Sequence, residues 1–151
     1  KSYIGLLVGK RLKLEFVDRD KEIENEIGLS ISKIFELKGE NYFRKFEEKI
    51  TLKKLKLKSK VISLGGGAFI NNIIRKEILK NHISFWLNLD DKILIKRIKN
   101  SKKRPIAFNA SDNELIELIK KRSNIYSKAL YEIKCDNLSK NAIVKRILEI
   151  L

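Results

Sequence analysis

The chain has little or none of several residue types that mark special classes of protein. Its 151 residues include one cysteine, Cys135, and one histidine, so an internal disulfide and a structural zinc site are both excluded. Lysine or arginine interrupts every apolar run before it reaches the roughly 20 residues that a membrane-spanning helix needs. These scarcities predict a cytoplasmic protein with no membrane partner.

Methionine is also absent, even at the first position. The chain opens at Lys1-Ser2 with a helical pattern already under way, because Ile4, Leu7 and Val8 follow at helical spacing. We therefore expect a sequence that is trimmed at its N-terminus.

The charge balance is strongly basic. The chain carries 34 lysines and arginines against 19 aspartates and glutamates, a formal net charge of +15. A basic surface is the usual footprint of nucleic-acid binding, but here the basic residues are scattered along the whole chain and most are lysines. We therefore predict a solvated surface that attracts small anionic substrates and binds no specific nucleic acid.

Apolar residues make up 43% of the chain, which suits one folded domain and excludes intrinsic disorder. Short apolar and β-branched runs predict strands at 14–17, 61–64, 83–89 and 131–135. Helical periodicity predicts helices at 2–12, 21–27, 30–39, 40–55, 72–79, 91–98, 114–123 and 141–151. This alternation predicts a parallel sheet covered by helices on both faces, with ligands at the carboxyl ends of the strands.

Chemically useful residues follow two of these strands. Asp18 and Asp20 come at the end of the first strand, and the only glycine cluster, residues 65–67, follows the second. Two carboxylates near Lys1 and Ser2 would suit a magnesium and phosphate site, because Mg²⁺ prefers oxygen ligands and phosphate needs fixed positive charge. The same two acids also fit ordinary turn positions.

Short motifs spread along the chain resemble those of one enzyme family. Lys1-Ser2 matches the end of a phosphate-binding loop of the form G-x-x-x-x-G-K-[ST]. The other matching segments are Phe16-Val17-Asp18-Arg19-Asp20, Gly39-Glu40 with Phe43-Arg44 and Glu47, Leu64-Gly65-Gly66-Gly67-Ala68, Arg104-Pro105, and Arg122 with Tyr126. In this order and spacing, over essentially its whole length, the chain resembles shikimate kinase.

The resemblance implies an α/β, three-layer P-loop kinase fold in a single domain, residues 1–151. The parallel sheet would have the strand order 2-3-1-4-5, with strand 1 missing from this chain. The strands at 61–64 and 83–89 would then stand apart or pair directly with each other. The substrate-binding region would span residues 19–56, and residues 99–112 would form a lid.

The implied activity is transfer of the γ-phosphoryl group of ATP to the 3-hydroxyl of shikimate, giving shikimate 3-phosphate and ADP in aromatic amino acid biosynthesis. ATP and Mg²⁺ are the implied cofactors, shikimate is the small-molecule partner, and a monomer is expected. We expect the chain itself to be inactive, because its phosphate loop is incomplete.

The resemblance assigns five residues to the phosphate side of the site. Lys1 would contact the β- and γ-phosphates, and Ser2 would ligate Mg²⁺ with the help of Asp18. Arg104 would close over the phosphates from the lid, and Arg97 would stack near the adenine.

The other assigned residues would bind shikimate. Asp20 would hydrogen-bond its hydroxyls and accept the proton of the attacking hydroxyl. Arg44 and Arg122 would clamp its carboxylate, and Glu47 would orient Arg44. The backbone N–H groups of residues 65–67 would approach the ring.

Simpler interpretations and other functions remain open. Arg44 and Glu47, three residues apart on a predicted helix, also fit a weak surface ion pair. The glycine cluster also fits a tight backbone turn. The alternative functions are another small-molecule P-loop kinase, such as a gluconate kinase, and a non-catalytic kinase-like binding module.

Overall fold

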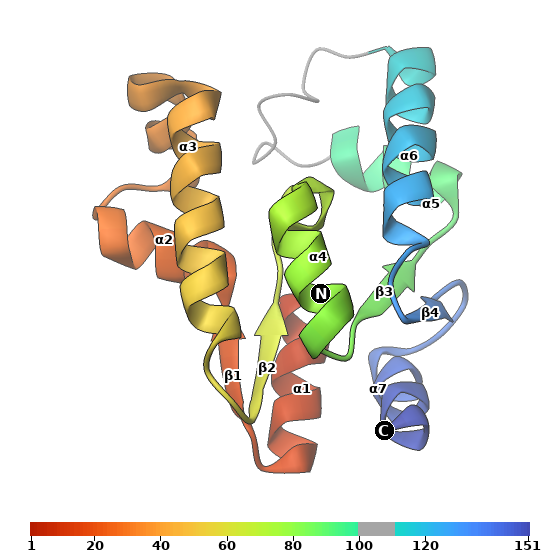
Figure 1. The fold of residues 1–151 in the computed structure, drawn as a ribbon. Helices are drawn as coiled ribbons and strands as arrows, with labels where there is room; N and C mark the ends of the chain where they lie inside the picture. Colours follow the sequence, from red (N-terminus) through yellow and green to blue (C-terminus); the bar gives the residue numbers. More distant parts are fainter. Residues whose placement is uncertain (100–110) are drawn as a thin grey trace.

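A computed structural model of the chain describes residues 1–99 and 111–151. Helices and strands alternate along most of the chain (Figure 1). Their order is α1 (Ser2–Leu12), β1 (Glu15–Asp18), α2 (Arg19–Ile27), α3 (Ile31–Leu55), β2 (Lys60–Ser63), the 3₁₀ helix η1 (Ala68–Ile70), α4 (Asn72–Asn81), β3 (Phe85–Asn88), α5 (Asp91–Lys99), α6 (Asp112–Tyr126), β4 (Tyr131–Lys134) and α7 (Lys140–Ile150). The predicted α/β class is confirmed.

The strands form two separate parallel pairs. In one pair Phe16 of β1 lies opposite Val61 of β2, and in the other Trp86 of β3 lies opposite Glu132 of β4. Within the described residues β2 does not pair with β3. Strands that stand apart were one of the two predicted arrangements, while the full order 2-3-1-4-5 stays a prediction.

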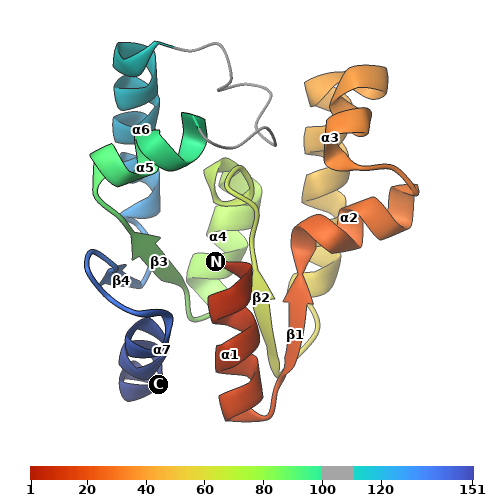
Figure 2. The same cartoon turned by 180° about the vertical axis from the view of Figure 1, so that it is seen from behind.

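Helices α1 and α4 lie on opposite sides of the strands, as the two opposed views in Figure 1 and Figure 2 show. Helix α1 packs on β1 and β2, and it also contacts α7. Its predicted bounds are confirmed residue for residue.

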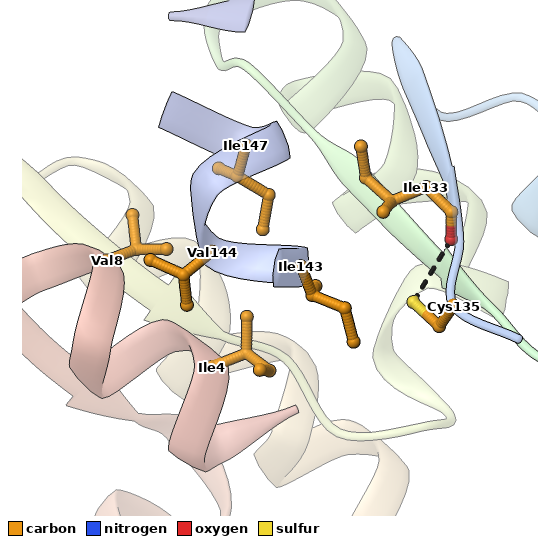
Figure 3. Packing of buried hydrophobic residues seen from close by; sticks show 7 residues of the cluster. All are labelled: Ile4, Val8, Ile133, Cys135, Ile143, Val144 and Ile147. Carbon is orange, nitrogen blue, oxygen red and sulfur yellow. Dashed lines mark hydrogen bonds between the residues drawn. The ribbon is translucent and has the colours of Figure 1, made fainter. Parts of the chain in front are cut away.

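The largest hydrophobic cluster joins the two strand pairs. Ile4 and Val8 of α1 point toward Ile143 and Val144 of α7, and Ile133 of β4 lies in the same cluster (Figure 3). Partly buried Val61 and Phe85, from the two different strand pairs, pack against these residues. One core therefore holds both halves of the molecule together without a continuous sheet.

Helices α2 and α3 pack on each other through a second apolar cluster, which contains Ile23, Ile34 and Phe43. Gly39 breaks α3 with φ 79° and ψ 169°, a backbone conformation that residues other than glycine rarely adopt. The sequence predicted a helix end at this glycine, and the structure confirms the break within one longer run.

Two strands, β3 and β4, are shorter than the sequence predicted, whereas β1 and β2 have the predicted length and are shifted by one residue. The run at 83–89 predicts a central strand, whereas β3 spans only Phe85–Asn88 and all four of its residues are half-buried. Within the described residues β3 pairs on one side only, with β4, so its central position stays a prediction. No helix in the described parts of the chain is long and apolar enough to cross a membrane.

The predicted lid lies mostly outside the described residues. Lys99 ends α5 and Asp112 begins α6, so the two ends of the predicted segment are helical. The side chains of Lys99 and Asp112 form an ion pair.

Candidate active site

The first site residues lie where β1 passes into α2. Asp18 ends the strand, and its carboxylate accepts a hydrogen bond of 3.1 Å from the backbone N–H of Asp20. Aspartate is a preferred residue at this capping position because its oxygen satisfies an N–H group that has no partner within the helix. The cap holds both acids at the carboxyl end of β1, as the sequence predicted.

Helix α1 brings Lys1 and Ser2 to the same place. Lys1 Nζ lies 3.4 Å from Asp20 Oδ2, and the Ser2 hydroxyl forms a hydrogen bond with the Asp18 carboxylate. Burial alone would raise the pKa of Asp18, but the Ser2 hydrogen bond, the Lys1 charge and the N–H groups of Lys21 and Asp20 together lower it. Asp18 is therefore held as a carboxylate.

The donor set at Ser2 and Asp18 fits magnesium. Among residues 1–99 and 111–151 there is no cluster of three or more acidic, histidine or cysteine side chains that could hold a metal ion. Mg²⁺ does not need such a cluster, because it commonly takes one or two protein oxygens and completes its shell with water and substrate phosphates. A hydroxyl and a carboxylate in direct contact can supply those protein oxygens.

Arg44, on the second half of α3, is held by two glutamates. Its Nη1 donates to Glu47 Oε2 over 2.8 Å, and its Nη2 donates to Glu40 Oε1 over 3.1 Å. Burial alone would lower the pKa of Arg44, but the hydrogen bonds and charges of Glu47 and Glu40 outweigh it and raise the pKa. The expectation that Glu47 orients Arg44 agrees with this contact, and one-third of the Arg44 side chain remains exposed.

The glycine cluster between β2 and η1 lies between the two predicted carboxylate-binding arginines. A Cβ atom on Gly67 would overlap the guanidinium of Arg44. A Cβ atom on Gly66 would lie 3.9 Å from Arg122 Nη1 and 3.9 Å from the hydroxyl of Tyr126. Side chains that are 78 residues apart in sequence therefore reach one short backbone segment.

Helix α6 presents Arg122 and Tyr126, which lie four residues apart and thus on one face of the helix. The Tyr126 hydroxyl donates a hydrogen bond to the carbonyl oxygen of Gly66. Arg122 Nε is buried and has no hydrogen-bond partner within the described residues. A buried donor of this kind is costly unless a ligand or water satisfies it.

Arg19 is the site residue that the sequence interpretation missed. Its guanidinium is buried between Asp20 and Glu47, at 2.6 Å and 2.7 Å from their carboxylate oxygens. A Cβ atom on Gly65 would overlap this guanidinium, so the missing side chain of Gly65 makes room for Arg19. The available signal was an arginine placed between two acids at the end of a strand.

Two further assigned residues have less direct evidence. Arg97 is exposed on α5, and its charge acts both on the α-amino group of Lys1, whose pKa is lowered mainly by burial, and on the thiol of Cys135, whose pKa is raised by burial. Arg97 therefore lies within electrostatic reach of Lys1, and its contact with adenine stays a prediction. Arg104 lies outside the described residues.

Comparison with known proteins gives one consistent family. The family model described as shikimate kinase matches residues 1–151. The shikimate kinase of Bartonella quintana is 37% identical over 149 residues, which are 98% of this chain and 71% of that protein. The shikimate kinase of Bacillus subtilis is 37% identical over 153 residues and covers 100% of this chain and 82% of its own length.

Solved structures agree with the sequence comparison. Shikimate kinase from Aquifex aeolicus superimposes with a TM-score of 0.89 at 34% identity, over 99% of this chain and 88% of that one. Shikimate kinase from Acinetobacter baumannii in complex with shikimate gives a TM-score of 0.89 at 28% identity, over 98% of this chain and 84% of that one.

Proposed function

This chain belongs to the shikimate kinase family, and from that premise we propose how its charged site serves the family's reaction. The reaction transfers the γ-phosphoryl group of ATP to the 3-hydroxyl of shikimate and gives shikimate 3-phosphate and ADP. In phosphoryl transfer the protein itself carries out little covalent chemistry. The site therefore acts mainly by positioning the reactants and neutralising their charge.

The arrangement of two arginines beside the glycine cluster carries the proposal. Arg44 adjoins Gly67 and Arg122 adjoins Gly66, so two guanidinium groups from distant helices face one segment. A guanidinium binds a carboxylate through two parallel hydrogen bonds, and a pair of them selects for an acid. The unpartnered Nε of Arg122 supplies one such donor. We assign the shikimate carboxylate to this place.

Asp20 is the proposed partner of the substrate hydroxyls. Its side chain is about one-third exposed, and Lys1 Nζ is 3.4 Å from one of its oxygens. In the reaction Asp20 would accept the proton from the 3-hydroxyl as that oxygen attacks the γ-phosphorus. Lys1 would then neutralise phosphate charge close to the same carboxylate.

Ser2 and Asp18 are the proposed protein ligands of magnesium. When bound, Mg²⁺ would neutralise charge on the phosphates of ATP. Asp18 would help hold the ion in its carboxylate form, since its pKa is lowered. We further propose that Arg104 closes over the phosphates and that Arg97 adjoins the adenine. We also propose that the protein is a cytoplasmic monomer that binds no specific nucleic acid.

We also propose the strand order 2-3-1-4-5 for the complete sheet. Strands 2, 3, 4 and 5 of that order correspond to β1, β2, β3 and β4 of the structure. The observed pairs, β1 with β2 and β3 with β4, are therefore its two outer pairs. Among residues 1–99 and 111–151, β2 pairs only with β1 and β3 only with β4, and a further strand between β2 and β3 would pair with their free edges.

Replacement of Arg44 by lysine tests the proposed function. Lysine keeps the charge but cannot form two parallel hydrogen bonds, so Arg44→Lys should weaken shikimate binding by about 10-fold or more. Binding of ATP should remain within about twofold, because Arg44 lies on the substrate side. Isothermal titration of the full-length protein with each ligand measures both. Equal loss of both ligands, or tighter binding of gluconate than of shikimate, would count against the proposal.

A further inference from the structure

One charged side chain at the substrate side has no task in the proposed reaction. Arg19 is the first residue of α2 and only 1% of it is exposed. Removing a guanidinium from water is costly unless carboxylates compensate its charge. The contacts of Arg19 therefore indicate what the protein gains by burying it.

Arg19 joins two carboxylates that come from different elements. Its Nη2 donates to Asp20 Oδ1 over 2.6 Å, and its Nη1 lies 2.7 Å from Glu47 Oε1. Glu47 is also buried, and its second oxygen accepts a hydrogen bond of 2.8 Å from Arg44. The four side chains form a row of alternating charge that runs from Asp20 through Arg19 and Glu47 to Arg44.

The glycine cluster closes this row from the other side. A Cβ atom on Gly65 would overlap Arg19 Nη2 and would lie 2.6 Å from Asp20 Oδ1. The backbone of Gly65 therefore packs directly on the guanidinium and limits the directions in which Asp20 can turn.

The two contacts of Arg19 differ in kind. The contact with Asp20 is an aligned hydrogen bond. The contact with Glu47 is an ion pair without alignment, because Arg19 Nη1 and Glu47 Oε1 have no hydrogen-bond partner within the described residues. An aligned, charge-assisted hydrogen bond fixes the orientation of its partner as well as offsetting charge. Arg19 thus orients Asp20, while Glu47 offsets its charge without an aligned hydrogen bond.

We propose that Arg19 is a positioning residue that holds Asp20 at a set distance from Arg44. The inference rests on the proposed function, in which Asp20 binds the hydroxyls of the substrate and Arg44 binds its carboxylate. A guanidinium can serve two carboxylates at once through separate nitrogens of one rigid plane, whereas lysine has a single nitrogen. A spacing that is set before the substrate arrives lowers the entropy lost on binding.

The variants Arg19→Lys and Arg19→Met test this inference, each titrated calorimetrically with shikimate and, separately, with ATP. We expect the dissociation constant for shikimate to rise by about 10-fold in both, a loss typical of removing a group that orients a ligand-binding residue. The dissociation constant for ATP should stay within about twofold. Arg19→Lys keeps the charge and most of the volume, so it decides the question if Arg19→Met does not fold.

A matched control separates positioning from general loosening of α2 and α3. Lys54 on α3 forms an ion pair with Glu22 on α2, so Lys54→Met breaks another link between the same two helices. This variant should bind shikimate as the unaltered protein does. If it loses as much affinity as Arg19→Lys, the link between the helices matters rather than Arg19, and the inference is overturned.

A double variant tests whether Arg19 acts through Asp20. If it does, Asp20→Asn combined with Arg19→Lys should lose little more shikimate affinity than Asp20→Asn alone, because the two residues act as one unit. If the fold-losses of shikimate affinity in Arg19→Lys and Asp20→Asn multiply in the double variant, the inference is overturned. Unaltered shikimate binding by both Arg19 variants would also overturn it. If the unaltered protein itself fails to bind shikimate, the proposed function is overturned and this inference falls with it.

Discussion

Asp18 performs a structural and a chemical task with one carboxylate. It caps α2 through the backbone N–H of Asp20, and it shares a hydrogen bond with Ser2 of α1. These contacts favour the ionised form, and they outweigh a burial that acts against it. The residue that caps the helix is thereby also kept in the charge state that a magnesium ligand needs.

Ser2→Ala should raise the pKa of Asp18 toward or above its usual value of 3.8, because burial would then be opposed only by Lys1 and backbone N–H groups. A carboxyl whose pKa is lowered on folding stabilises the protein above its unfolded pKa, and this contribution is lost as the pH falls through the folded value. Ser2→Ala should therefore make the unfolding free energy less dependent on pH on the acid side. A carboxyl-detected NMR titration measures the pKa.

The control for this prediction is Ser30→Ala, which removes a helix-capping hydroxyl from α3. It should leave the pKa of Asp18 unchanged while it destabilises the protein by about 1 kcal/mol. An unaltered Asp18 titration in Ser2→Ala would show that the hydroxyl does not hold the carboxylate.

The segment between β2 and η1 illustrates how one element serves several side chains. Its three glycines look alike in sequence, yet Gly65 makes room for Arg19 and Gly67 makes room for Arg44, whereas a Cβ atom on Gly66 would only make ordinary van der Waals contact with Arg122 and Tyr126. The glycines with positive φ in the described chain are Gly28 and Gly39, so none of the three is needed for a left-handed turn. The close approach of side chains explains Gly65 and Gly67.

Gly65→Ala should destabilise the protein by about 1 to 3 kcal/mol, the usual cost of forcing a methyl group into filled space. Gly66→Ala meets nothing closer than 3.9 Å, and it should change the free energy of unfolding by less than about 0.5 kcal/mol. Chemical denaturation of both variants measures the difference. A larger loss in Gly66→Ala than in Gly65→Ala would contradict the packing of Arg19 on Gly65.

At the scale of the whole molecule, two parallel strand pairs share one core through α1 and α7. This arrangement leaves the first residues of α1, the end of β1 and the glycine cluster near one another. The net charge of +15 surrounds a site whose proposed ligands, ATP and shikimate, are both anions. A field of this sign raises the rate at which small anions arrive.

If the basic residues are spread over a solvated surface, random duplex DNA should bind only weakly. This binding should vanish by about 150 mM salt, because counterion release would supply all of its free energy. Fluorescence anisotropy of a labelled duplex across a salt series measures this. Shikimate binding at the same salt concentration is the control for an intact protein. A DNA complex that persists and selects for sequence would contradict the absence of a nucleic-acid partner.

Local patterns in the sequence were enough to predict most elements. The helical spacing of Ile4, Leu7 and Val8 predicts α1 within its observed bounds, and Gly39 predicts the break in α3. Strand ends were less predictable, because the length of a strand depends on its partners. Five of the seven residues at 83–89 are apolar, yet the observed strand is Phe85–Asn88, which pairs on one side only within the described residues.

The sequence by itself determined the α/β class, the family and the order of the charged motifs, because helix periodicity, capping residues and motif spacing are short-range properties. Only the tertiary structure decided which side chains meet. Arg19 lies 28 residues from Glu47 and 46 from Gly65, and its burial between them depends on how β1, α3 and the glycine segment pack. The separation of the two strand pairs is likewise a long-range property, since backbone pairing depends on which strand lies alongside and not on the residues within one strand.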